Sequence, residues 1–262
     1  MRSRYTLFNL TFGVLGGMLI IFVILPILST ISSTSLSSFW LSFTDPEVLR
    51  SMTLTFLAAA IATLLAAIGG IPLAYLLARR KFTGKRLVEA LVDLPVVIPH
   101  TAAGIALLMV FGRRGLLGQW FEPFGITFTD SLGGIVVAML FVSLPFLVNM
   151  SREAFALVDE ELERVALTDG ASPWQAFWWV TLPLAWRGVL GGAVMMWARG
   201  ISEFGAVVIL AYHPKIVPVL VYERFTGFGL AAAQPVALLL ILASLLVFGL
   251  LRLALLPERK ES

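Results

Sequence analysis

Three of the ionisable residues inside long apolar segments are the first candidates for chemistry. Arg199 and Glu203 stand four residues apart in the apolar segment 184–211, and His100 lies in a second one, 87–111. Charged side chains in such segments are costly and by default indicate function. An arginine held there lowers the cost of bringing an anion into a low dielectric, and a carboxylate beside it tempers the attraction so that the anion can leave. The pattern is that of an anion pathway.

Simpler interpretations of the same residues stay open. Arg199 and Glu203 have the i,i+4 spacing at which two side chains on a helix neutralise each other. A lone histidine in an apolar segment is more often a hydrogen-bonded packing residue than a ligand. A third interpretation makes Glu203 and His100 proton sites of an ion-gradient transporter, and a fourth combines them with Asp93 in a membrane enzyme. The sequence shows no metal-ligand spacing and no nucleophile–base pair, which counts against an enzyme.

Composition limits the class of protein. The chain has 262 residues, of which 59% are hydrophobic and 13% charged, which predicts a polytopic membrane protein embedded in a lipid bilayer. It has no cysteine, only two histidines (His100 and His213) and no glycine-rich phosphate loop. We therefore expect no catalytic residue, no metal and no bound cofactor. Nothing in its net charge of +3 indicates a nucleic-acid partner.

The apolar segments predict an all-α integral membrane protein, a single transmembrane domain over residues 1–262 with six spans. The expected spans are 7–31, 51–78, 87–111, 132–150, 184–211 and 236–256. Their connections are 32–50, 79–86, 113–130, 159–183 and 212–234, followed by the charged tail 257–262. Five bases fall within 79–86, and the positive-inside rule places that loop, both termini and segment 159–183 in the cytoplasm. The expected location is the plasma membrane.

The polar segment 159–183 separates two of these spans. Its first half is acidic, and its apolar residues recur at helical spacing, which predicts a short amphipathic helix that Asp169-Gly170 ends. A second helix is predicted to start at Ser172, with Pro173 in its first position and Gln175 completing a capping box. Trp174, Phe177 and Trp178 are expected on one face of it, as a docking surface.

The same segment resembles a loop of ABC importer permeases. In that family a Glu-Ala-Ala triplet precedes Gly-x9-Ile-x-Leu-Pro; here the triplet is Arg164-Val165-Ala166, and Gly170 is followed by Val180, Leu182 and Pro183. The resemblance implies that 159–183 forms the coupling helix that docks on a cytoplasmic ATPase subunit. The residues it implies for that contact are Glu161, Arg164, Val165, Ala166, Asp169, Gly170, Trp174, Phe177, Trp178, Leu182 and Pro183.

Two further segments resemble the permeases of tetrahedral oxyanions. These are 94–105, which contains Ile-Pro-His-Thr, and 198–206, which contains Glu-Phe-Gly-Ala; together with 222–225 they are most similar to the molybdate/tungstate branch. The resemblance covers about residues 51–250, and sulfate/thiosulfate permeases remain the alternative. It implies a pathway through Pro99, His100, Thr101, Arg199 and Glu203. It also implies a homodimer, two ATPase subunits that bind ATP and Mg, and an external substrate-binding protein.

Overall fold

The computed structural model describes residues 2–254, and within that range every regular element is a helix. The all-α prediction is confirmed. Five helices are long and apolar enough to cross a membrane, and the bent pair α4–α5 makes a sixth span if its halves count as one. The helices are α1 (Arg2–Ser33), α2 (Leu36–Thr44), α3 (Pro46–Arg79), α4 (Lys85–Val97), α5 (His100–Phe111), α6 (Gly118–Phe121), η1 (Glu122–Phe124), α7 (Leu132–Leu157), α8 (Glu160–Thr168), α9 (Pro173–Ala176), η2 (Phe177–Thr181), α10 (Leu182–Ile201), α11 (Gly205–Leu210), α12 (Val217–Phe228) and α13 (Leu230–Ala254).

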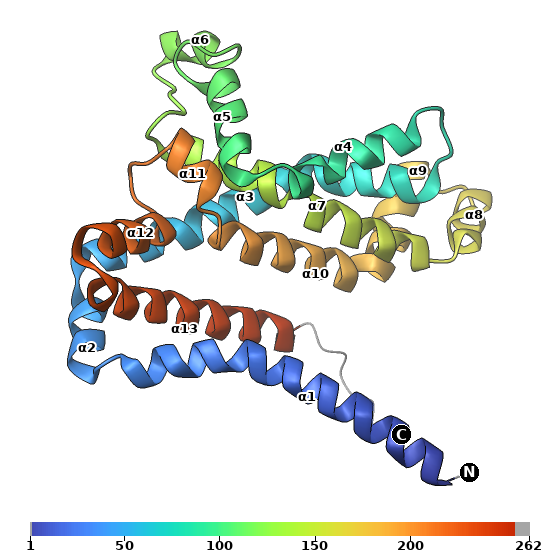
Figure 1. The fold of residues 1–262 in the computed structure, drawn as a ribbon. Helices are drawn as coiled ribbons and strands as arrows, with labels where there is room; N and C mark the ends of the chain where they lie inside the picture. Colours follow the sequence, from blue (N-terminus) through green and yellow to red (C-terminus); the bar gives the residue numbers. More distant parts are fainter. Residues whose placement is uncertain (1, 255–262) are drawn as a thin grey trace.

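Helices α3, α7 and α10 form the centre of the molecule (Figure 1). Small residues of α3, including Ala58, Ala59 and Ala62, are buried in the main core together with Met139 of α7. In a bilayer no hydrophobic force draws helices together, so small residues that let backbones approach closely drive this packing. Helices α8 and α9 lie at one end of the three-helix layer, the α8 end, and α12 lies at the other, the α12 end (Figure 1).

The third predicted span is not one helix. Helix α4 ends at Val97 and α5 begins at His100, and the two halves are bent by 113°. The cause is Pro99, which has no N–H to continue the α4 ladder and forces Ile98 into extended backbone at φ −72° and ψ 132°. The span predicted over 87–111 is thus present as two helices with a break at Pro99.

The fifth predicted span is divided as well. Helix α10 ends at Ile201, and a separate short helix, α11, starts at Gly205. At the start of α11, Glu203 Oε1 accepts a hydrogen bond from the Ala206 N–H at 2.9 Å. This carboxylate satisfies a backbone donor that the helix itself leaves free. The segment predicted over 184–211 as one span thus consists of two helices, and Glu203 lies at the break between them.

Three predicted connections contain helices. Segment 32–50 holds α2 and the start of α3, segment 113–130 holds α6 and η1, and segment 212–234 holds α12 and the start of α13. Val217 and Leu220 of α12 are buried against Val48 of α3 and Val236 of α13. Burial of this apolar face stabilises a helix in a segment that was predicted to be an external loop. Helix α13 also begins earlier than predicted, at Leu230. The predicted tail 257–262 lies outside the described residues.

An ion-pair cluster joins α12 to the start of α3. Arg224 Nη2 lies 2.5 Å from Asp45 Oδ2, and Lys215 Nζ lies 2.7 Å from Glu223 Oε1 and 3.3 Å from Glu47 Oε1. Hydrogen bonds from Arg224 and Lys215 hold the pKa values of Asp45 and Glu223, respectively, below their usual range. The hydrogen bond to Glu223 in turn raises the pKa of Lys215.

These directions predict how the cluster responds to pH. The stabilisation from the depressed carboxyl groups is complete above their ordinary pKa of about 4 and is lost as pH falls through the lower folded values. The stabilisation from Lys215 is complete below its ordinary pKa of about 10.4 and is lost as pH rises through the raised folded value. We expect Arg224→Met to lower the unfolding temperature near neutral pH and to differ less from the wild type in acid, as measured by thermal unfolding in detergent across pH. A constant difference down to pH 3 would contradict this.

Candidate functional site

The two breaks in the spans lie against each other. A Cβ on Gly205, the first residue of α11, would lie 2.7 Å from the Cβ of His100, the first residue of α5. A Cβ on Gly104 of α5 would lie 2.8 Å from the Cβ of Ile209 of α11. Real Cβ atoms do not approach so closely, so glycine at both positions allows the two short helices to pack together. This contact places His100 beside the residues that follow the end of α10.

His100, Arg199 and Glu203 form one polar cluster at that contact. His100 Nδ1 lies 2.8 Å from Glu203 Oε2, and Arg199 Nη2 lies 3.1 Å from the same oxygen. Arg199 Nη2 also lies 2.9 Å from each ring nitrogen of His100. The predicted Arg199–Glu203 pair across a helical turn is thus present. The direct contact of His100 with both partners was not predicted, because the residues are a hundred positions apart.

The donors and acceptors of the cluster complement one another. A carboxylate only accepts and a guanidinium only donates, so Glu203 Oε2 is the acceptor that the His100 ring and Arg199 share.

Exposure separates the acid of the cluster from its cation. The side chain of Glu203 is 0% exposed, that of Arg199 is 23% exposed and that of His100 is 35% exposed. The guanidinium and imidazole thus face the accessible side of the cluster, with the carboxylate behind them. Pro99 and Thr101 are exposed beside His100, at the break and in the first turn of α5. The cluster offers donors for binding and no nucleophile for bond chemistry.

The acids in the first half of the broken span have other partners. Asp93 Oδ1 accepts from Asn149 Nδ2 at 2.6 Å, and Glu89 Oε1 accepts from Arg152 Nη1 at 3.1 Å. Both bonds tie α4 to α7. Asp93 therefore does not join His100 and Glu203, and the constellation required by the membrane-enzyme alternative is not assembled.

The segment between α7 and α10 has the local structure that the sequence predicts. Asp159 accepts from the Glu161 N–H at the start of α8 at 3.0 Å. Gly170, with φ +93°, ends α8 in a Schellman motif in which the Ala171 N–H bonds to the Ala166 carbonyl at 3.0 Å. The capping box between Ser172 and Gln175 then starts α9. We call residues 159–183, which include α8, α9 and η2, the coupling segment, after the role that the sequence resemblance implies for it.

Most residues that were predicted to contact a partner lie on the surface of the coupling segment. Trp174 is 70% exposed and Trp178 is 53% exposed. Glu161 and Arg164 are exposed and paired with each other at 2.9 Å; Val165, Asp169, Gly170 and Pro183 are exposed as well, whereas Ala166 and Leu182 are half-buried.

Phe177 is the exception, because it is buried against Tyr75 and Phe155, with ring centroids 5.0 and 6.0 Å apart. Its placement on the aromatic docking face was wrong. The backbone changes to a π-helix at η2, and Phe177 anchors that turn in the core.

One residue of the coupling segment was missed by the sequence analysis. Glu163 faces inward and bonds to Tyr75, Arg79 and Thr181, which belong to α3 and η2. Its chemical type gives no signal, because it is one of three acids in the first turn of α8. Only its position on the inward face of that helix distinguishes it.

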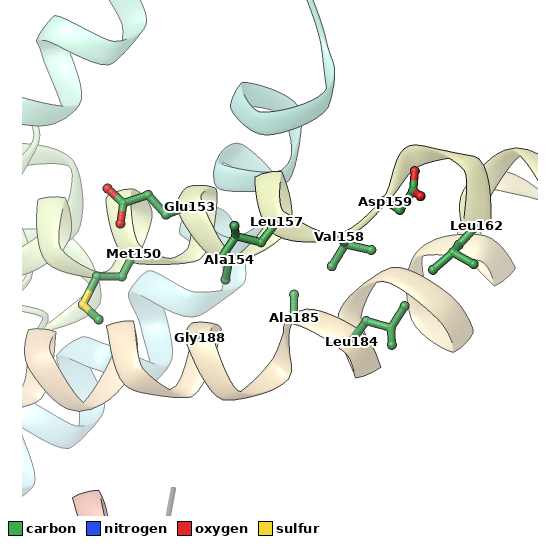
Figure 2. A pocket seen from close by; sticks show the side chains of 10 residues that line it. All are labelled: Met150, Glu153, Ala154, Leu157, Val158, Asp159, Leu162, Leu184, Ala185 and Gly188. Carbon is green, nitrogen blue, oxygen red and sulfur yellow. The ribbon is translucent and has the colours of Figure 1, made fainter. Parts of the chain in front are cut away.

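A cavity of about 520 Å³ lies beside the coupling segment. Figure 2 shows it between α7 and α10, where Glu153, Leu157 and Leu184 border it and α8 closes one end. The ionisable residues that line it, Glu153 and Asp159, are both acids. An oxyanion would be repelled there, so the cavity is not a second anion site.

The fold and the site define a membrane transport component: a bundle of apolar helices with a polar cluster at two broken spans and a capped surface segment at one end. The family described as "Binding-protein-dependent transport system inner membrane component" matches residues 70–256, and the chain belongs to this family. It is the transmembrane permease component of an ABC transporter, in which ATP hydrolysis is carried out by separate subunits.

Relatives with similar sequences carry more specific names. The chain is 42% identical to the molybdate/tungstate transport system permease protein WtpB of Thermococcus kodakarensis, over 96% of this chain and 97% of the relative. It is 43% identical to the protein of the same name from Pyrococcus abyssi, over 95% of each chain. It is 34% identical to the sulfate transport system permease protein CysT of Synechocystis, over 90% of this chain and 85% of the relative.

Solved structures confirm the fold. A bacterial ABC transporter that imports the acidic polysaccharide alginate contains a chain with a TM-score of 0.75 and 15% identity, over 100% of this chain and 98% of that chain. The MetNI methionine ABC transporter in an inward-facing form gives a TM-score of 0.63 at 17% identity, over 85% of this chain and 96% of that chain.

Proposed function

We propose that this permease translocates molybdate and/or tungstate into the cytoplasm. The observation that carries the proposal is the cluster in which Arg199 and His100 cover the buried carboxylate of Glu203 at the meeting point of two broken spans. Broken helices in a membrane direct unpaired backbone groups and charged side chains at a substrate. The names of the relatives that cover most of both chains support the choice of anion, and the sulfate permeases are less similar.

The cluster suits an anion that must bind and leave. Arg199 supplies a permanent positive charge, and Glu203 limits the net charge of the site so that the anion is not trapped. Pro99 and Thr101 border the path at the break. The site recognises charge and hydrogen-bond acceptors, so discrimination among oxyanions rests mainly with the external substrate-binding protein.

The proposed assembly has a second copy of this chain, two cytoplasmic ATPase subunits that bind ATP and Mg, and an external binding protein. The coupling segment, the bases of 79–86 and both termini face the cytoplasm, and the α12 end faces outward. The exposed residues of the coupling segment dock on the ATPase. Closure of the ATPase dimer on ATP opens the pathway at the polar cluster to the outside, the binding protein releases its anion into it, and hydrolysis resets the cycle.

Co-purification of the tagged chain from membranes of its native host tests this assembly. We expect an ATPase subunit to be recovered with the wild type and to be lost or uncoupled with Gly170→Val or Trp178→Asp. Gly170 has φ +93° and open space around it, so valine strains the backbone turn that presents the coupling segment.

The control is Gly125→Val, since Gly125 has φ +74°, open space around it and a position between α5 and α7. It imposes the same kind of strain away from the coupling segment and is expected to leave assembly intact. Recovery of the chain alone, active under an ion gradient, would instead support the secondary-transporter alternative.

Competition between oxyanions for uptake tests which of them is the substrate. In reconstituted vesicles with the complete complex, we expect labelled molybdate uptake to be reduced by excess tungstate and to persist at a comparable excess of sulfate. Equal competition by sulfate would favour the sulfate/thiosulfate alternative.

A further inference from the structure

We propose that Glu163 is the positioning residue that transmits movement of the coupling segment into two membrane spans at once. Its carboxylate accepts hydrogen bonds from Arg79 Nε at 2.9 Å, Thr181 Oγ1 at 2.8 Å and Tyr75 OH at 3.0 Å. Tyr75 and Arg79 belong to the last turns of α3, and Thr181 immediately precedes α10. The inference rests on the proposed role of the coupling segment and names the contact through which it acts.

Burial distinguishes Glu163 from the neighbouring acids. The side chain of Glu163 is 14% exposed and that of Arg79 is 6% exposed, whereas Glu160 and Glu161 are 54% and 67% exposed and pair with Arg164. Exposed pairs contribute little, but a buried charge that loses its partner is costly. The bonds of Glu163 therefore persist when α8 moves, whereas the outer pairs exchange readily with water.

Arg79 also connects α3 to the turn between α7 and α8. Its Nη2 donates to the Val158 carbonyl at 2.8 Å, at the turn that joins α7 to α8. One guanidinium thus holds both the start of α8 and, through Glu163, its inward face. Figure 1 shows α8 at the end of the molecule where α3, α7 and α10 converge. A displacement of α8 must carry α3 and α10 with it or break several buried bonds.

The π-helix η2 provides the third connection. Thr181 Oγ1 lies 2.8 Å from Glu163 Oε1 and 3.4 Å from the Ala176 carbonyl. The Thr181 hydroxyl therefore contacts both the Glu163 carboxylate and the backbone of the π-helical turn. Thr181 is fully buried. Because α10 leads from this turn to Arg199, Glu163 and the anion site lie at the two ends of one helix.

The test measures anion uptake per ATP hydrolysed, with labelled molybdate and the complete complex in proteoliposomes. Glu163→Gln keeps the shape of the side chain and removes the charge that holds Arg79. We expect it to retain the ATPase subunit and its hydrolysis while uptake per ATP falls at least about fivefold, the size of a typical coupling energy between sites. Glu153→Gln removes an exposed acid at the same end of the molecule and is expected to leave the ratio unchanged.

Non-additivity provides a second readout. Arg79→Gln should lower the same ratio, and the effect of the double variant Arg79→Gln/Glu163→Gln should be smaller than the two single effects combined, because both variants break the Arg79–Glu163 contact. Thr181→Val, which removes a single donor, should have a smaller effect in the same direction and serves as the test if the charge variants do not fold. An unchanged ratio in Glu163→Gln, or in a folded Thr181→Val, overturns the inference.

The outcomes also separate this inference from the proposed function. If Gly170→Val and Trp178→Asp uncouple the complex and Glu163→Gln does not, the proposed role of the coupling segment is supported and the proposed role of Glu163 is contradicted. If all three variants transport normally, the proposed role of the coupling segment is itself contradicted.

Discussion

Replacing Arg199 with alanine is expected to reduce anion uptake by at least about tenfold while leaving the ATPase subunit bound. A unit charge about 4 Å from an anion, at an effective dielectric near 20, stabilises it by roughly 4 kcal/mol, which is far more than the 1.4 kcal/mol that corresponds to a factor of ten. Part of this is offset by Glu203, 3.1 Å from Arg199 Nη2, so tenfold is a lower bound. Uptake of labelled molybdate in vesicles measures the effect.

Arg187→Ala is the matched control for that experiment. Arg187 lies on the same helix, α10, nearer to the coupling segment, and it is exposed. Its loss removes the same charge from the chain but not from the polar cluster, so uptake should stay close to that of the wild type. Loss of the ATPase subunit in Arg199→Ala would mean that Arg199 holds the fold rather than the anion.

Removing the carboxylate of Glu203 is expected to destabilise the protein. Glu203 is fully buried, and it accepts hydrogen bonds from the His100 ring and the Ala206 N–H in addition to its ion pair with Arg199. Breaking a buried pair by removing one partner costs about 3–5 kcal/mol, because the remaining charge is left uncompensated. Glu203→Ala should therefore lower the unfolding temperature in detergent and the yield of folded protein.

Glu203→Gln separates the two contributions of this side chain. Glutamine keeps a carbonyl oxygen for the Ala206 N–H but removes the negative charge next to Arg199. We expect its unfolding temperature to lie between those of the wild type and Glu203→Ala. A Glu203→Ala protein as stable as the wild type would show that the carboxylate does not anchor the two broken spans.

Much of the architecture could be predicted from local pattern. Apolar length and composition identify the spans, and the sequence from Asp169 to Gln175 correctly predicts the end of α8 and the start of α9, because capping depends on neighbouring residues alone. The i,i+4 spacing of Arg199 and Glu203 likewise predicts their contact. These features depend on residues within a few positions of one another.

Other features depend on residues that are distant in the sequence, and there local pattern was insufficient. The breaks inside the spans predicted over 87–111 and 184–211 could not be located, because a break is tolerated only where another segment covers it, and each break here is covered by the other. Phe177 was assigned to the surface because its helical spacing matches Trp174 and Trp178, but a π-helix turns it into the core.

The sequence by itself determined the class of protein, its helices and the chemical types available for an anion site. The tertiary structure alone decided which of these residues meet. It brings His100 to Glu203 at 2.8 Å and Glu163 to Arg79 at 2.9 Å, across 103 and 84 positions of the chain. The physical reason is that hydropathy and capping are local properties, whereas the partner of a buried charge is set by how helices pack, through small residues such as Gly205 that let two backbones approach.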